Sequence, residues 1–182
     1  MQTYDALRKA PRTDLNDTFP LSVPLALYVE PTNVCNFRCV LCPESFPDYQ
    51  ARAGYYQRMS MPLYEKIVAD ILEMGRIRSL KLYFEGEPLL NPDLPLMVSM
   101  AREAGIADRI EVTSNGSLLN ARRATELIEA GLDYLQISVY SVNDSGHREI
   151  AGVNKFTPRQ IMENVRGVVR LRNLRGASAP FV

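Results

Sequence analysis

The sequence predicts an α/β domain in which repeated strand–helix units form a parallel sheet, as in a partial (β/α) barrel. Two observations lead to this fold class. Short apolar stretches alternate along the chain with amphipathic segments, and most of these amphipathic segments end at a glycine, which often stops a helix. A strand–helix–strand order implies parallel pairing with right-handed crossovers. A doubly wound sheet is the alternative, and the strand patterns alone do not exclude it.

Each apolar stretch is expected to be a buried strand because branched and aromatic residues dominate it. The four stretches are 25–30 (LALYVE), 80–85 (LKLYFE), 109–114 (RIEVTS) and 134–140 (YLQISVY). The carboxyl ends of parallel strands meet at one edge, where (β/α) barrels carry their chemistry. Residues that follow these stretches are therefore the first candidates for a site.

The amphipathic segments are expected to be helices with recognisable ends. They cover residues 61–75, 91–105, 120–131 and 157–172, and the first three end at a glycine. Asn91 and Pro92 have the pattern of an N-cap followed by the first helical position. Thr157 and Gln160 have the spacing of a capping box. These signals predict where the second and fourth helices begin.

Length and charge describe one ordinary globular domain. The chain has 182 residues, and its 21 Lys and Arg balance its 21 Asp and Glu, so neither a nucleic acid nor a membrane is expected as a partner. Residues 1–24 contain several prolines, lack the apolar segment of a signal peptide and are expected to form an irregular arm. Residues 25–182 form the predicted domain, and a cytoplasmic location is expected.

All three cysteines, Cys35, Cys39 and Cys42, lie in the loop that follows the first predicted strand. A disulfide would leave one thiol unpaired, and three structural thiols among polar neighbours are a poor core pattern. Structural zinc needs a fourth ligand, and the single histidine, His147, is far along the chain. A cubane iron–sulfur cluster on three cysteines would leave one iron open, which favours a catalytic cluster over an electron carrier.

The motif Cys-x3-Cys-x2-Cys, within EPTNVCNFRCVLCP, resembles the signature of radical S-adenosylmethionine (SAM) enzymes. It is most similar to the branch with C-terminal SPASM or Twitch domains that carry auxiliary clusters. The resemblance extends from about Leu25 to Arg172. It implies a [4Fe–4S] cluster on Cys35, Cys39 and Cys42. It also implies reductive cleavage of SAM to a 5′-deoxyadenosyl radical, which abstracts hydrogen from an organic substrate such as a carbohydrate or a peptide.

The resemblance also implies a SAM site at the ends of the next strands. Glu87, in YFEGEPLLNP, matches the acid that binds the SAM ammonium group, where a charge-assisted hydrogen bond is strong. Gly86 is expected to let the backbone approach the ligand. Glu85 stands where the family has a first glycine, so the backbone contact at that position is in doubt.

Further cofactor-binding residues are implied after the third and fourth strands. Ser114 and Asn115 match a segment that the family places beside SAM, although Asn-Gly is also a common turn pair. Ser138 matches a serine that contacts the methionine or ribose part of SAM, because a hydroxyl both donates and accepts. Tyr140, on the same face of the strand, is a weaker candidate. No catalytic residue beyond these is predicted.

Besides Glu85, two positions depart from the family pattern. Ala151 replaces an arginine that can contact the SAM carboxylate, so the expected substitute is Arg148, Lys155 or a residue outside this chain. Leu41 replaces an aromatic residue before the third cysteine, which reduces adenine stacking to an apolar contact. His147 is expected to be an exposed loop residue.

About four βα units are present of the six expected for such a core, which predicts that the chain is the N-terminal part of a longer enzyme, truncated before the fifth strand. An electron donor such as flavodoxin or ferredoxin is implied as a partner. Two alternatives stay open: an iron–sulfur binding or electron-transfer protein without radical chemistry, and a zinc-stabilised interaction domain.

Overall fold

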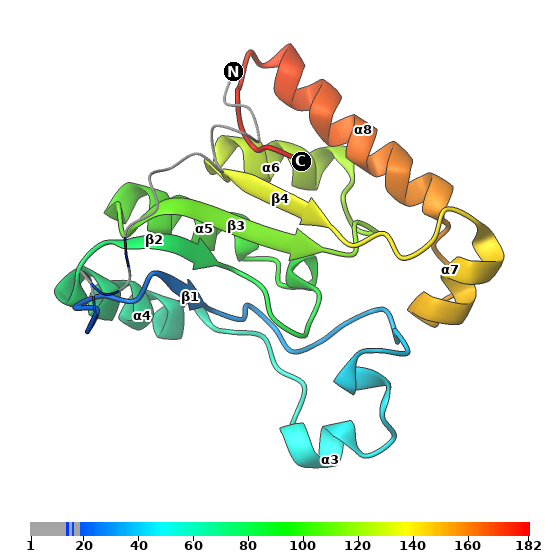
Figure 1. Ribbon diagram of the computed structural model, residues 1–182. Helices are drawn as coiled ribbons and strands as arrows, with labels where there is room; N and C mark the ends of the chain where they lie inside the picture. The colour runs from blue at the N-terminus through cyan, green and yellow to red at the C-terminus, as the bar shows by residue number, and fades with distance from the viewer. Residues whose placement is uncertain (1–13, 15, 17–18) are drawn as a thin grey trace.

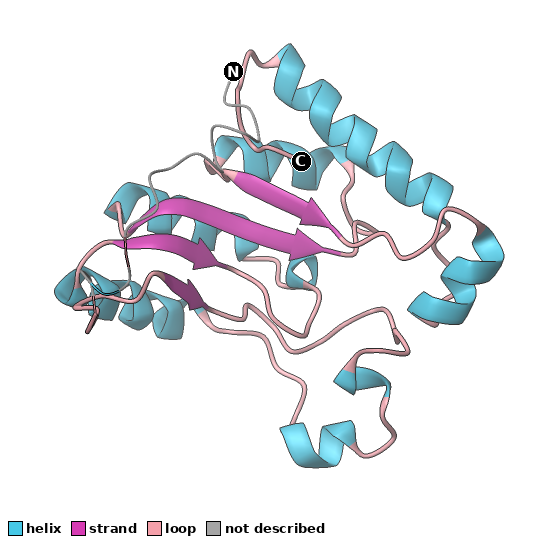
Figure 2. Ribbon diagram, viewed as in Figure 1, coloured by secondary structure: helices cyan, strands magenta, loops and turns pink. Residues whose placement is uncertain are grey.

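The computed structural model describes residues 14, 16 and 19–182, so the expected arm at 1–24 lies largely outside the described residues. Four parallel strands form one sheet in the order β1-β2-β3-β4. Their arrows all point the same way in Figure 2. The strands are β1 (Ala26–Tyr28), β2 (Ile77–Lys81), β3 (Ala107–Ser114) and β4 (Tyr134–Ile137).

Helices connect the strands and cover one face of the sheet, as Figure 1 shows for α4, α5 and α6. The α-helices are α3 (Tyr49–Ala53), α4 (Met61–Met74), α5 (Leu94–Ala104), α6 (Ala121–Glu129), α7 (Asp144–Ala151) and α8 (Pro158–Leu174). Two 3₁₀ helices, η1 (Pro43–Ser45) and η2 (Pro88–Leu90), lie in the loops after β1 and β2. None of the helices in the described part of the chain has the length and apolar character needed to cross a membrane.

The strand order decides between the two fold classes that the sequence allowed. A doubly wound sheet reverses its strand order at a switch point. Here each strand pairs with the next one along the chain, without a reversal. The partial (β/α) barrel with four units is therefore confirmed.

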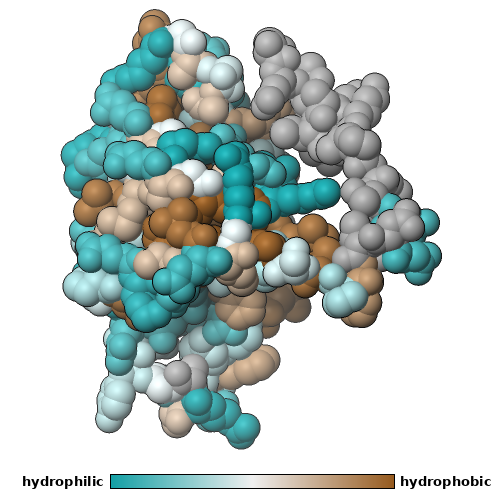
Figure 3. All heavy atoms as spheres, turned by 90° about the vertical axis from the view of Figure 1, so that its left-hand side faces the viewer, coloured by the Kyte–Doolittle hydropathy of each residue, from teal (hydrophilic) through white to brown (hydrophobic). Residues whose placement is uncertain are grey.

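The core lies between the sheet and its helices. The central side chains of this layer are at most 1% exposed: Leu80, Ile110, Val112 and Leu135. Apolar side chains of the helices, such as Tyr64, Met97 and Leu127, pack against them. Figure 3 looks at the side where the strands begin and shows hydrophobic atoms at the centre with hydrophilic ones around them. This buried layer supports the loops at the carboxyl ends of the strands.

Several predicted boundaries were wrong. β2 begins at Ile77 instead of Leu80, because the Ile77 N–H already bonds the Ile106 carbonyl at 2.9 Å. It ends at Lys81, and by Glu85 the backbone N–H bonds a side chain instead of a neighbouring strand. β4 ends at Ile137 instead of Tyr140, because its partner β3 itself ends at Ser114.

The start of α5 also differs from the prediction. Asp93, not Asn91, occupies the N-cap position, and the helix begins at Leu94. The Asn91 side chain instead donates to the Pro31 and Met59 carbonyls, at 2.8 and 3.3 Å. A tertiary contact thus displaced the local capping signal. The predicted capping box of Thr157 and Gln160 is confirmed at the start of α8.

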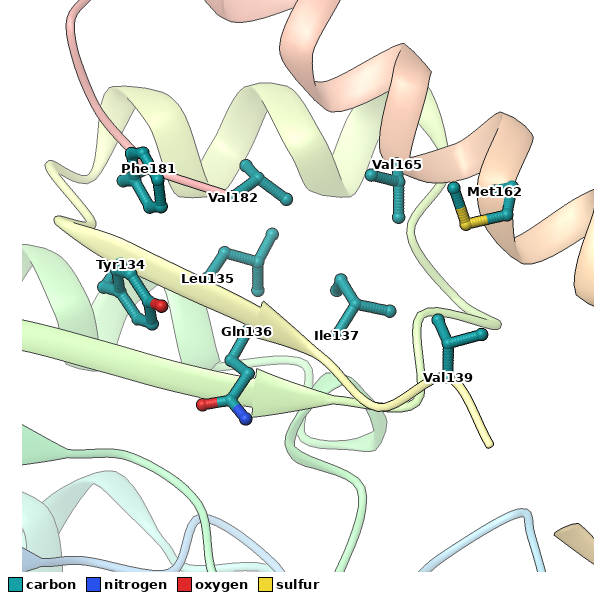
Figure 4. Close-up of a pocket in the computed structure, with 9 residues that line it drawn as sticks. All are labelled: Tyr134, Leu135, Gln136, Ile137, Val139, Met162, Val165, Phe181 and Val182. Atoms are coloured by element: carbon teal, nitrogen blue, oxygen red, sulfur yellow. The ribbon is translucent and has the colours of Figure 1, made fainter. Parts of the chain in front are cut away.

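The outer edge of β4, opposite β3, carries a pocket of about 320 Å³. Figure 4 shows Leu135 and Ile137 of β4 pointing toward α8 and the chain's last residues, while Gln136 points away. Phe181 pairs in parallel with Tyr134 and accepts a 2.8 Å hydrogen bond from the Leu135 N–H. The pocket is lined by β4, α8 and residues 181–182, and no residue of the cysteine loop lines it.

Candidate active site

The three cysteines lie on a loop that is held against α7. Cys35, Cys39 and Cys42 are free thiols and are partly buried. The N–H groups of Arg38 and Val40 donate to the carbonyls of Ala151 and Ile150, at 3.1 and 2.9 Å. These bonds fix the loop to the last turn of α7.

The buried side chain of Phe37 also holds this loop in place. Its side chain is 1% exposed and belongs to a small second apolar cluster with Ala151 and Ile161. Its ring stacks on Phe156, with the centroids 6.0 Å apart. Burying a phenylalanine contributes roughly 2–3 kcal/mol, so the loop has an anchor of its own, separate from the main core.

Gly152 allows the close approach of α7 to the loop. It caps α7 with a φ of +64°, in the left-handed region that favours glycine. A Cβ at this position would lie 2.2 Å from the Arg38 carbonyl oxygen. Any larger residue would therefore push the cysteine loop away from α7.

The chemistry of the thiols fits an iron–sulfur cluster. Burial raises the pKa of all three thiols, and that of Cys35 reaches about 12. Metal binding requires thiolates, so the positive charge of iron would have to ionise them. In the described part of the chain, no three His, Cys, Asp or Glu side chains converge on a point that could hold one metal ion. In a cubane each cysteine binds a different iron, so the sulfurs need not converge in this way.

The loop after β2 is packed against the segment that leads into the cysteine loop. Gly86 has no room for a side chain, because a Cβ would lie 2.0 Å from the Thr32 carbonyl oxygen. The Glu87 N–H donates to the Val34 carbonyl at 2.8 Å. The structure thus shows a close approach of Gly86 to the chain's own backbone, and its approach to the ligand stays a prediction.

Glu30 holds this loop in place, a role that was not predicted from the sequence. Its Oε1 accepts the N–H groups of Glu85 and Gly86, at 2.7 and 2.9 Å. Glu85 stands where the family has a glycine, and its backbone N–H is hydrogen-bonded to Glu30. The only local signal for Glu30 was a carboxylate at the end of an apolar stretch.

Glu87 joins the loops that follow β2 and β3. Its side chain is buried, with 2% of the residue exposed. One carboxylate oxygen accepts from the Ser114 hydroxyl at 2.7 Å and the Leu89 N–H at 3.1 Å, and the other accepts from the Asn115 N–H at 2.7 Å. Burial raises the pKa of this carboxyl, while these hydrogen bonds lower it. Its contact with the SAM ammonium group stays a prediction.

Asn115 connects the loop after β3 to the cysteine loop. Its side-chain amide donates to Asn36 Oδ1 at 2.8 Å, and Asn36 donates to Ser117 Oγ at 2.9 Å. Ser117 in turn donates to Asn115 Oδ1 at 2.6 Å. This closed ring of hydrogen bonds sets the position of the residue next to Cys35.

Ser138 and Tyr140 complete the edge after β4. The Ser138 N–H donates to the Ser114 carbonyl at 2.9 Å. Burial raises the pKa of the Tyr140 hydroxyl, and the nearby Cys39 thiol adds to this rise. The four residues predicted to share one edge of the sheet are confirmed there, after four successive strands: Cys35, Glu87, Asn115 and Ser138.

The prediction for His147 was wrong. It lies in α7, is 1% exposed, and its ring meets Phe37 edge-on with the centroids 5.7 Å apart. Neither ring nitrogen has a hydrogen-bond partner among the described residues. The sequence did not predict this helix, because seven of its eight residues are polar or small and give no apolar helical pattern. Its buried residues, His147 and Ala151, pack on the cysteine loop.

The other departures from the family pattern lie around the cysteine loop. Leu41 is 87% exposed, so it is free to contact a ligand. Arg148 is exposed on α7. The Lys155 ammonium lies 5.5 Å from the centroid of Phe156, which stacks on Phe37. The Lys155 ammonium thus lies near a ring that stacks on Phe37 of the cysteine loop.

Carboxylates gather where the cysteine loop meets α3. The Tyr49 hydroxyl of α3 donates to Glu85. Glu44 follows Cys42, is buried, and pairs with Arg38 at 3.1 Å. Burial raises the pKa of Glu44 to about 7. No sequence pattern predicts a role for Glu44, because its burial depends on the fold of the loop.

Comparison with known proteins agrees with this geometry. The family model of the Radical SAM superfamily matches residues 29–172. The chain is 34% identical over 128 residues to a probable GTP 3′,8-cyclase of Metallosphaera sedula, covering 70% of the chain and 38% of that protein. It is 30% identical over 151 residues to the PqqA peptide cyclase of Xanthomonas oryzae pv. oryzae, covering 83% of the chain and 38% of that protein.

A solved structure shares the fold. The crystal structure of native anSMEcpe with bound AdoMet superposes with a TM-score of 0.65 at 18% identity, over 82% of the chain and 42% of that protein. The chain spans less than half the length of these proteins. Because the family match covers most of the chain, from the end of β1 into α8, the protein belongs to the Radical SAM superfamily, whose members use a [4Fe–4S] cluster and SAM.

Proposed function

We propose that Cys35, Cys39 and Cys42 bind a [4Fe–4S] cluster and that SAM binds beside it, at the carboxyl ends of β2, β3 and β4. When bound, the cluster supplies the electron that cleaves SAM and starts radical chemistry. The observation that carries this proposal is the cysteine loop, fixed to α7 and joined by hydrogen bonds to the loop after β3. The substrate is an organic small molecule or a peptide, and the electron donor is a protein such as flavodoxin or ferredoxin in the cytoplasm.

The residues around the loop would have distinct roles. Ser138 and Asn115 would offer polar contacts to SAM, and the exposed Leu41 would offer an apolar surface to its adenine. Lys155 is the better candidate for the SAM carboxylate, because its ammonium is linked through Phe156 to the cysteine loop. Glu87 would bind the SAM ammonium group and Gly86 would allow the backbone to approach SAM, while both also hold the loops in place. We also propose the branch with auxiliary clusters, which the similarity to a PqqA peptide cyclase supports.

Anaerobic reconstitution with iron and sulfide tests the proposal. We expect about four irons per chain, a reduced cluster whose EPR signal changes when SAM is added, and formation of 5′-deoxyadenosine by the full-length enzyme. Cys35→Ala, Cys39→Ala and Cys42→Ala should each abolish cluster assembly, while Ser45→Ala in the same loop should leave it intact. A cluster indifferent to SAM would support an electron-transfer protein, and zinc without iron would support an interaction domain.

A further inference from the structure

The face of the sheet opposite the helices carries polar side chains. The register aligns Tyr28 of β1 with Lys81 of β2, and Lys81 with Glu111 of β3. In a parallel sheet such neighbours point to the same side. We call this side the open face and define it by Tyr28, Ser79, Lys81, Arg109, Glu111 and Gln136. It lies directly below the loops that form the proposed SAM site.

Lys81 places a positive charge on the open face, next to Glu111 in the register. Among the described residues it forms no ion pair, although Glu111 is its neighbour in the register. The Glu111 carboxylate is engaged by the Ser79 hydroxyl and by Arg109, whose Nε lies 2.6 Å away. Lys66, in contrast, pairs with Asp70 on α4. The charge of Lys81 is thus available to a ligand.

Tyr28 adds a second hydrogen-bond donor next to this charge. Lys81 Nζ donates to the Tyr28 hydroxyl oxygen at 2.9 Å, which leaves the phenol proton free to point elsewhere. The Tyr28 ring is held edge-on by Tyr83 and Phe84, at centroid distances of 5.5 and 6.0 Å. The Tyr28 side chain is 52% exposed. An ammonium and a phenol at this separation match two oxygens of a single carboxylate or phosphate group.

We propose that Lys81 and Tyr28 form an anion subsite that binds a carboxylate or phosphate group of the substrate. The proposal rests on the function proposed above, because it places the substrate in the same site. Lys81 and Tyr28 are the last residues of their strands. Glu85 follows Lys81 by four residues, which span at most about 13 Å of extended chain. An anchored substrate would therefore extend from the open face toward the cysteine loop.

Calorimetric titration of the purified, reconstituted chain with inorganic phosphate, and separately with acetate, tests the subsite. The titrations are run at constant ionic strength, without SAM or reductant. We expect Lys81→Gln to weaken binding of the preferred anion about tenfold, the loss of one charge-assisted hydrogen bond. Tyr28→Phe should weaken it a few-fold. Lys81→Arg should retain binding, and Lys66→Gln, on the outside of α4, should bind as the wild type does.

The outcomes separate this inference from the proposed function. Stronger binding of phosphate identifies a phosphorylated substrate, and stronger binding of acetate identifies a carboxylic acid. Equal affinities of Lys81→Gln and wild type, or wild-type protein that binds neither anion, would overturn the subsite. Neither result bears on cluster assembly or on the response of the EPR signal to SAM. Conversely, absence of a cluster would leave the anion titration interpretable.

Discussion

The two faces of the sheet use the same four strands for different purposes. On the helix-covered face, Leu80, Ile110 and Leu135 are at most 1% exposed and belong to the main apolar cluster. On the open face, Lys81, Glu111 and Gln136 alternate with them along the chain and carry charges or amides. Because successive residues of a strand point to opposite sides, one short segment supplies both the stability and the binding groups. We therefore expect substitutions on the helix-covered face to change folding stability and substitutions on the open face to change ligand binding.

The largest effect is expected on the helix-covered face. Ile110→Ala removes a fully buried side chain and should lower the free energy of unfolding by roughly 2–5 kcal/mol, through lost burial and the cavity left behind. Denaturant unfolding followed by circular dichroism measures this. A loss below about 1 kcal/mol would contradict the assignment of this face as the core.

The next effect concerns the contact between α7 and the cysteine loop. Gly152→Ala places a Cβ against the Arg38 carbonyl in a left-handed conformation and should cost about 3 kcal/mol, combining backbone strain and overlap. It should also reduce the iron bound per chain. Gly105→Ala is the matched control, because it caps α5 at a similar φ of +63° with nothing within 4 Å of the added Cβ. Equal iron contents of the two variants would show that the close approach does not position the cysteines.

Glu87 lies at the boundary between the buried core layer and the proposed SAM site. Glu87→Ala leaves the Ser114 hydroxyl and the Asn115 and Leu89 N–H groups without their acceptor, so we expect a loss of about 2 kcal/mol in unfolding free energy. Glu103→Ala, an exposed glutamate of α5, should change it by less than about 0.5 kcal/mol. Unfolding of Glu87→Ala at the wild-type denaturant concentration would show that these hydrogen bonds do not stabilise the edge, and unchanged SAM binding would contradict the contact with the SAM ammonium group.

The smallest effect is expected on the open face. Gln136→Ala removes an exposed amide from β4 and should change the unfolding free energy by less than about 0.5 kcal/mol. The same denaturation experiment, run beside Ile110→Ala, checks it. A loss as large as that of Ile110→Ala would mean that the two faces do not divide stability and binding as we infer.

The sequence by itself determined the elements and their order. Apolar stretches, capping residues and terminal glycines predicted four strands and four of the helices, because these signals depend on neighbours along the chain. The motif that contains Cys35, Cys39 and Cys42 predicted the metal chemistry, and parallel pairing placed Glu87, Asn115 and Ser138 on one edge. All of this follows from local pattern and from the geometry of parallel strands.

Only the tertiary structure decided which groups hold the site together. His147 is buried because α7 packs on Phe37, and the amide nitrogen of Asn91 donates to the distant Pro31 carbonyl. Glu30 pairs with backbone groups that lie 55 and 56 residues away. Gly86 and Gly152 are required by backbone oxygens from distant segments. No local pattern encodes such contacts, because they arise only when segments far apart in the sequence are brought together by the packed sheet.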